Sequence, residues 1–156
     1  MKQIMPKILN DIKVDLADEF DKNFERKAFF NKPWKARKFP DKGSLLNKTG
    51  NLRKIHARVS GNSVVFSSDT DYAALHNYGG EIPVTKARKK FFWAMYYKTK
   101  KEYWKGLALK PVGSMITIPQ RQFLGWHPSL QKNIDAIVGR RLKQAVGDMV
   151  KRMNKR

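Results

Sequence analysis

The sequence predicts an α+β protein in which long helices at the two ends enclose short strands. Three observations support this fold class. Apolar residues recur at helical spacing near the N-terminus, helical spacing returns near the C-terminus, and the segments between them alternate and are bounded by turn residues. The chain of 156 residues is 41% hydrophobic, which is enough for one domain over residues 1–156 with a packed core.

Residues 4–30 are expected to form the N-terminal helix, because their apolar residues return every four positions. Pro6 is tolerated only in the first turn, so the helix should begin close to it. The helix should end before Pro33, because a residue that precedes proline avoids the helical region. The apolar stripe consists of Ile4, Ile8, Ile12, Leu16, Phe20, Phe24 and Ala28.

Residues 31–83 are expected to form a loop followed by strands. Proline and glycine punctuate the basic stretch 31–50, which contains Trp34. A tryptophan in such a loop either fills the edge of a core or anchors an interface, and we favour the core.

Two strands are predicted over residues 51–59 and 63–68, which supply apolar positions on both sides of a turn. Gly61 and Asn62 lie between them, and this pair suits a tight hairpin. Residues 72–78 are expected to form a short helical segment that the following glycine pair ends.

The segment 84–112 combines bases with many aromatic residues, and it is predicted to be helical because it is too long for one strand and lacks alternation. Bases beside exposed aromatic rings would neutralise phosphate and stack nucleobases. We favour the alternative, in which the rings form a core, because a surface rarely exposes so many of them. The candidate polyanion-contacting residues are Lys86, Arg88, Lys89, Lys90, Lys98, Lys100 and Lys101.

Residues 113–126 are expected to form a strand and a corner, because positions 114–119 alternate between apolar and polar residues. The C-terminal helix is predicted over 128–153, with bases in its last turns that suit the negative end of the helix dipole. Its apolar face consists of Leu130, Ile134, Ile137, Val138, Leu142, Ala145, Val146, Met149 and Met153.

The formal net charge is +20, from 33 basic and 13 acidic residues. Residues 1–31 contain six acidic and six basic residues, so the whole excess lies in residues 32–156. A field of this size attracts polyanions and steers association with acidic partners. The candidate partners are therefore nucleic acid, an acidic protein surface, or both.

The chain contains no cysteine, which excludes disulfides, thiolate metal sites and thiol nucleophiles. No apolar run approaches the roughly 20 residues that a membrane span needs. The first residues also lack the apolar stretch of a signal peptide. We therefore expect a soluble protein made in a reducing compartment, with no membrane contact.

The sequence contains no recognisable catalytic constellation. Metal-ligand spacings, phosphate-binding glycine loops and nucleophile motifs are absent. Asp69, Asp71 and His76 would form a metal site only if the fold brought them together, and two aspartates capping a turn is the simpler interpretation. We expect no enzymatic activity, no catalytic residue, no metal and no cofactor.

Four short motifs follow one another between residues 33 and 125. They are Pro33-Trp34, Leu46-Asn47-Lys48-Thr49-Gly50-Asn51-Leu52-Arg53, Tyr72-Ala73-Ala74-Leu75-His76-Asn77-Tyr78-Gly79-Gly80, and Ile118-Pro119-Gln120-Arg121-Gln122-Phe123-Leu124-Gly125. In this order they resemble the phage virion morphogenesis family, the tail-completion proteins of Mu-like and related tailed phages. The segment 84–112 looks like a family-variable insertion.

This resemblance implies a structural virion protein of a phage or prophage that finishes the tail and joins tail to head, usually as a ring of copies. It implies a small antiparallel sheet flanked by a long N-terminal helix and a C-terminal helix. It also implies tail or head-tail connector proteins as partners, in the host cytoplasm during assembly and then in the virion. The candidate interface or fold-determining residues are Trp34, Thr49, Gly50, Leu52, Tyr72, His76, Gly79, Gly80, Arg121, Phe123, Leu124 and Gly125.

Two of these residues carry a specific structural expectation. Gly50 is free to take a positive φ in a turn that feeds the first strand. Arg121 is placed to bridge to an acid or to backbone carbonyls and so fix a corner. A stand-alone protein that binds the nucleic-acid backbone is the second hypothesis for the function, because the charge alone supports it. A small nuclease is the third, but the acids cluster instead on the N-terminal helix, interleaved with bases.

Overall fold

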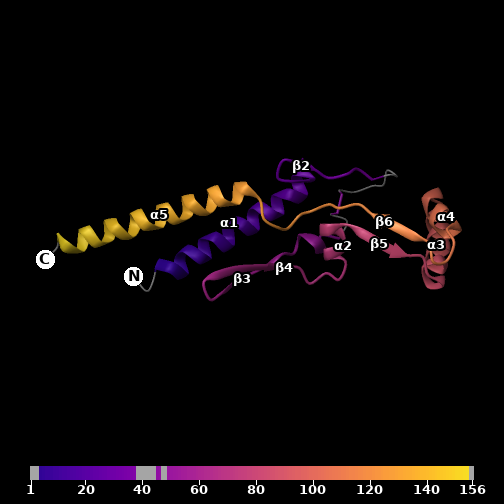
Figure 1. Cartoon of the computed structure of the whole chain (residues 1–156), viewed down its shortest axis with the longest axis horizontal. Helices are drawn as coiled ribbons and strands as arrows, with labels where there is room; N and C mark the ends of the chain where they lie inside the picture. The colour runs from indigo at the N-terminus through magenta and orange to yellow at the C-terminus, as the bar shows by residue number, and fades with distance from the viewer. Residues whose placement is uncertain (1–3, 38–44, 47–48, 155–156) are drawn as a thin grey trace.

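A computed structural model describes residues 4–37, 45–46 and 49–154 of the chain. The molecule is elongated, with two long helices at one end and a helical hairpin at the other (Figure 1). The elements in chain order are α1 (Ile4–Arg26), β1 (Ala28–Phe29), β2 (Lys32–Pro33), η1 (Asn51–Arg53), β3 (His56–Ser60), β4 (Ser63–Ser67), α2 (Ala73–Tyr78), β5 (Gly80–Pro83), α3 (Lys86–Thr99), α4 (Glu102–Leu109), β6 (Met115–Ile118) and α5 (Pro128–Met153). The predicted α+β class is confirmed, and both long helices are present.

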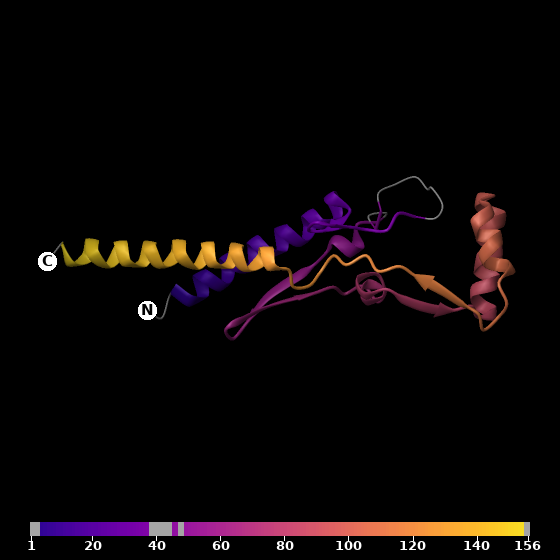
Figure 2. The same cartoon turned by 45° about the horizontal axis from the view of Figure 1, so that its top comes forward.

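The expected antiparallel sheet takes the form of three separate two-stranded ribbons. β1 pairs with β2, β3 with β4, and β5 with β6, each antiparallel. The β3–β4 hairpin turns at Gly61-Asn62 as predicted, and Gly61 takes a positive φ of 56° there. The β5–β6 ribbon leads to the α3–α4 hairpin, which stands across the far end of the molecule (Figure 2).

The N-terminal helix is shorter than predicted, because it ends at Arg26 and not at residue 30. Lys27 takes a positive φ of 54°, which terminates the helix, and the next residues turn back to form the β1–β2 ribbon. The side chain of Asn23 holds this turn, since its Oδ1 accepts a hydrogen bond from the Phe30 N–H at 3.0 Å. The apolar period therefore continues past the helix, and Ala28 is buried from a strand.

Two further predicted elements differ in detail. Residues 51–53 form a 3-10 turn instead of the start of a strand, and Gly50 precedes it with a φ of 73°. The single helix predicted within 84–112 is divided into α3 and α4, because Lys100 takes a left-handed conformation with φ 55°.

The core lies where α1 meets the central loops. Phe24, Trp34 and Phe123 pack ring against ring, with centroids 5.6 Å apart for Phe24 and Trp34 and 5.1 Å apart for Phe24 and Phe123. Trp34 is buried, and its indole N–H donates to the Gln122 carbonyl at 2.6 Å. Trp34 therefore occupies the core position that we favoured from the sequence.

A second core joins α1 to α5 and to the β3–β4 ribbon. Leu16, Phe20 and Leu130 are its buried members. The Arg141 guanidinium donates to both carboxylate oxygens of Asp11, at 2.6 and 2.8 Å. Beyond that ion pair, α5 continues past the N-terminal end of α1 in both views (Figures 1 and 2). In the described part of the chain, no helix is long and apolar enough to cross a membrane.

Candidate functional site

Six residues of the sequence motifs line one pocket of about 260 Å³, although they come from three separate stretches of the chain. We call it the motif pocket. Its walls come from η1, from α2 and from the segment that follows β6. The six motif residues are Leu46, Thr49, Leu52, Tyr72, His76 and Arg121.

Arg121 fixes this corner through backbone carbonyls, which is one of the two roles expected for it. Its Nε donates to the Lys35 carbonyl at 2.9 Å and an Nη donates to the Ala36 carbonyl at 3.5 Å. Its own backbone N–H donates to the His76 carbonyl at 2.8 Å. Because the guanidinium is buried and serves backbone groups, Arg121 joins the chain after β2 to α2 and to the segment after β6.

The surroundings of His76 favour the neutral form of its imidazole. Burial lowers its pKa, and the nearby positive charge of Arg121 lowers it further. Its Nδ1 is buried and has no hydrogen-bond partner among the residues that the structure describes. The described lining of the motif pocket contains no carboxylate that would pair with this imidazole for acid–base chemistry.

The two glycines after α2 leave little room for a side chain. Gly79 has a φ of 74°, and a Cβ there would lie 2.9 Å from the backbone nitrogen of Gln120. Gly80 has a φ of 159°, and its Cβ would lie 3.0 Å from a methyl of Leu75. Gly125, with a φ of 148°, would meet the side chain of Gln122. At each of these three motif positions a side chain would therefore meet a neighbouring group.

Two buried asparagines organise the same region, and sequence reasoning missed both. Asn77 Oδ1 accepts hydrogen bonds from the N–H groups of Phe123 and Leu124, each at 2.9 Å. Asn23 Nδ2 donates to the Phe123 carbonyl at 3.2 Å. The available signal was a polar residue beside Phe20 and Phe24, on the apolar side of α1, because a buried polar group needs partners. Leu124 packs against both cores.

Asp69, Asp71 and His76, which we weighed as a possible metal site, do not come together in the structure. Asp69 contacts the imidazole of His56 at 2.9 Å, while His76 faces the motif pocket. Among the residues with described coordinates, no three His, Asp or Glu side chains form a group that could hold a metal ion.

The α3–α4 hairpin carries the candidate polyanion-contacting residues in two different settings. Arg88 donates to the Pro83 carbonyl at 2.6 Å, and Lys89 donates to the Lys110 carbonyl at 2.9 Å, so both serve the hairpin itself. Lys86, Lys90 and Lys98 are exposed on α3. Lys100 and Lys101, the last two members of the set, lie at the α3–α4 junction, and Lys101 directly precedes α4. The Lys100 Nζ lies 5.6 Å from the centroid of the Tyr97 ring.

The aromatic residues of the hairpin are also divided. Phe92 is buried and stacks on Trp104 with centroids 6.0 Å apart, as the core interpretation predicts. Phe91 and Tyr97 remain 53% and 64% exposed, beside the exposed lysines of α3. The hairpin therefore has both a small aromatic core and a basic outer face with two accessible rings.

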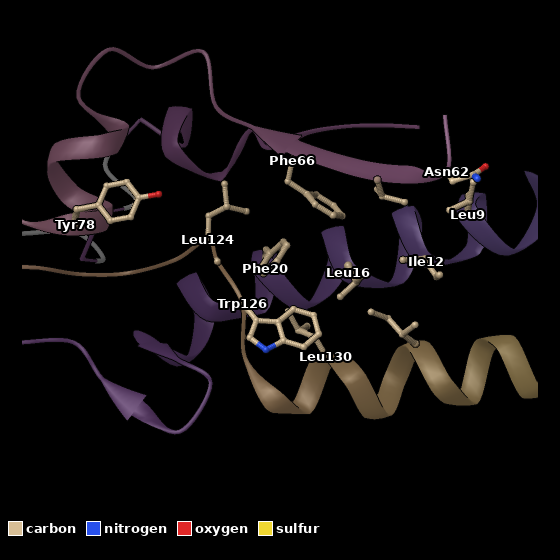
Figure 3. A pocket seen from close by; sticks show the side chains of 13 residues that line it. Leu9, Ile12, Leu16, Phe20, Asn62, Phe66, Tyr78, Leu124, Trp126 and Leu130 are labelled. Carbon is tan, nitrogen blue, oxygen red and sulfur yellow. The ribbon is translucent and has the colours of Figure 1, made fainter. Parts of the chain in front are cut away.

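An apolar groove of about 490 Å³ runs between α1, the β3–β4 ribbon and the first turns of α5 (Figure 3). Ile12, Leu16 and Phe20 form its floor along α1, and Phe66 points toward Phe20 from β4. Trp126 lies at its side and is 61% exposed. We call this feature the groove.

The C-terminal part of α5, residues 142–153, is mostly exposed, and we call it the tail. The sequence predicted one apolar face along α5, from Leu130 to Met153. The structure covers only the first half, where Leu130 and Ile137 are buried. The tail leaves five large apolar side chains between 46% and 69% exposed, namely Leu142, Val146, Met149, Val150 and Met153.

Buried motif residues that serve the backbone, together with exposed apolar and basic surfaces, are typical of a protein that works by contacting other macromolecules. Residues 7–143 match the phage virion morphogenesis family, and the chain belongs to that family. Comparisons with curated proteins and with solved structures gave no match. The family is one of structural proteins that act in building the virion.

Proposed function

We propose that this protein is a non-catalytic assembly component that completes the phage tail, joins the tail to the head, or does both, as a closed oligomer. Membership of the virion morphogenesis family carries this proposal. In this account the protein acts in the host cytoplasm during assembly and then stays in the virion. Its partners are further copies of itself and the tail or connector proteins that it meets.

The exposed apolar surface of the described chain supports a role in assembly. Monomeric proteins rarely leave large contiguous apolar patches in water, and such patches mark interaction sites. Here the groove and the tail are both apolar and both open. The motif pocket contributes by fixing α2 and the segment after β6, which places Leu124, Gly125 and Trp126 along the groove.

Contact with DNA is the second candidate function, and the outer face of α3 favours it. Between residues 84 and 112 there are nine basic residues and one acidic residue. Lys86, Lys90 and Lys98 are exposed beside two accessible aromatic rings, which suits phosphate and base contacts. In an assembled virion such a face would meet DNA passing through a channel, or an acidic face of a neighbouring protein.

The native mass of the purified protein, at low and at moderate salt, tests the proposal. We expect a closed oligomer that forms without DNA and persists at moderate salt, because apolar contacts are not screened. A monomer that takes up a short duplex and releases it as salt rises would favour the stand-alone nucleic-acid-binding function instead. The same titration with the duplex shows whether the oligomer itself contacts DNA.

A further inference from the structure

The apolar face of the tail is separate from the face by which α5 packs on α1. At 3.6 residues per turn, the side chains of Leu142, Val146 and Met149 lie roughly a third of a turn around the helix from Leu130 and Ile134. Even if α1 extended further along α5, it would therefore not cover the apolar face of the tail. The tail has the composition of a contact surface, but its own chain supplies nothing to cover it in the described structure.

The groove is an apolar channel that no side chain of the described residues fills. The first turns of α5 form one of its walls through Leu130 and Ile134. The tail belongs to the same continuous helix and extends ~18 Å beyond the Asp11–Arg141 ion pair, away from the groove. It cannot enter the groove of its own chain without breaking that helix.

Charge favours a match between the tail and the α1 side of a second copy. α1 contains six acidic and four basic residues, and it is the only described helix with a net negative charge. The tail contains three basic residues and one acidic residue, so two tails repel each other. The acids of α1 pair within their own chain, as Asp11 does with Arg141, and the described lining of the groove contains no charged residue. A basic tail is therefore repelled by another tail but meets no charge repulsion in the groove.

We infer that the tail of one copy occupies the groove of the next copy. This inference rests on the proposed oligomeric function and names its interface. Such a contact joins two different surfaces of the same chain, so it is heterologous and adds copies in one direction until the ring closes. Val146 and Met149 are the central side chains of the tail, and they contact the accessible part of the groove, which includes Ile12 and Trp126.

Cysteine cross-linking tests this arrangement cleanly, because the chain has no cysteine of its own. Val146→Cys is combined with Asn62→Cys or with Tyr78→Cys, which lie at opposite ends of the groove (Figure 3). We expect at least one pair to give a ladder of disulfide-linked copies on a non-reducing gel. Val146→Cys with Lys98→Cys is the control pair, because Lys98 lies on the distant α3–α4 hairpin.

A charge variant gives an independent readout on a residue that is already exposed, so folding is not at risk. Val146→Lys should reduce the oligomer at least tenfold, measured as a shift in the concentration at which copies associate. The matched control is Gly147→Lys, which adds the same charge beside the apolar face of the tail, about 100° around the helix from Val146, where a Cβ meets nothing within 4 Å. The control should associate as the wild type does.

The possible outcomes separate this inference from the proposed function. An oligomeric wild type with no groove cross-link, or with an unaffected Val146→Lys variant, overturns the interface and leaves the assembly function standing. Cross-linking of Val146→Cys alone would show tail-to-tail pairing and would also overturn it. A wild type that stays monomeric at every concentration overturns both.

Discussion

The side chain of Asn77 on α2 holds the backbone of Phe123 in the core. Its Oδ1 accepts the Phe123 N–H at 2.9 Å, and the adjacent Leu124 N–H donates to the same oxygen. Phe123 is fully buried against Phe24. This relationship places the start of the groove, because the chain runs on from Phe123 to Leu124 and Trp126.

Asn77→Ala should destabilise the fold by about 2–4 kcal/mol, because it leaves two backbone N–H groups near the core without an acceptor. Urea unfolding followed by circular dichroism measures this loss. Asn133→Ala is the matched control, since Asn133 is half-buried and donates to Asp15 at 3.1 Å on the surface of the helix pair. The control should lose no more than ~1 kcal/mol. Equal losses in the two variants would refute the role assigned to Asn77.

Gly79→Ala should destabilise the protein by roughly 1–3 kcal/mol, because an L-residue at that positive φ is strained and its Cβ meets the Gln120 backbone at 2.9 Å. Gly147→Ala should instead stabilise the protein against unfolding. Gly147 lies in α5 with open space around its Cβ, so alanine gains about 0.5–1 kcal/mol of helix propensity. Thermal unfolding should show a lower unfolding temperature for Gly79→Ala and a higher one for Gly147→Ala. An unchanged unfolding temperature in Gly79→Ala would contradict the close approach of the Gln120 backbone.

His76 should make the wild type lose stability as the pH falls below its ordinary pKa of 6.5. The pKa of the folded state is lowered by burial and by Arg121, so the unfolded chain binds the proton first and proton uptake favours unfolding. The loss begins as the pH falls through 6.5 and is complete below the lowered pKa of the folded state. His76→Gln should remove this dependence when unfolding free energies at about pH 7.5 and about pH 5.5 are compared. An unchanged pH dependence in His76→Gln would place its source elsewhere.

Replacing Lys86, Lys90 and Lys98 together by glutamine should weaken binding to a short DNA duplex. If each lysine neutralises one phosphate, the slope of log affinity against log salt falls by roughly 2–3. The control is Lys132, Lys143 and Lys151 replaced by glutamine, which removes the same charge from exposed positions on α5. A matching loss in the control would mean that the net charge binds DNA and that α3 has no special role.

The sequence was sufficient for the elements whose pattern is local. The β3–β4 turn at Gly61-Asn62 and the bounds of α5 follow from turn chemistry and helical spacing. The end of α1 could not be predicted from helical spacing, because the apolar period continues through Ala28. The positive φ of Lys27 and the hydrogen bond of Asn23 redirect the chain before that residue. Those two features depend on tertiary contacts, and the spacing of apolar residues carries no information about such contacts.

The candidate site was predicted only as a set of residues. The motifs named Tyr72, His76 and Arg121, but their meeting in one pocket depends on hydrogen bonds between distant backbone groups. The apolar stripe of α5 was visible in the sequence, but the stripe does not show how much of it is covered. Which half would be covered depends on which side of α5 faces α1, and that is set by tertiary contacts such as the Asp11–Arg141 pair, which spans 130 positions of the chain.

Electron microscopy of the purified wild-type protein tests the assembly account most directly. The account predicts closed rings of equivalent copies in the absence of DNA and of other virion proteins, because a heterologous contact between tail and groove must either close or continue. Single chains at every concentration, with rings appearing only when DNA is added, would contradict it and would indicate a nucleic-acid-binding protein.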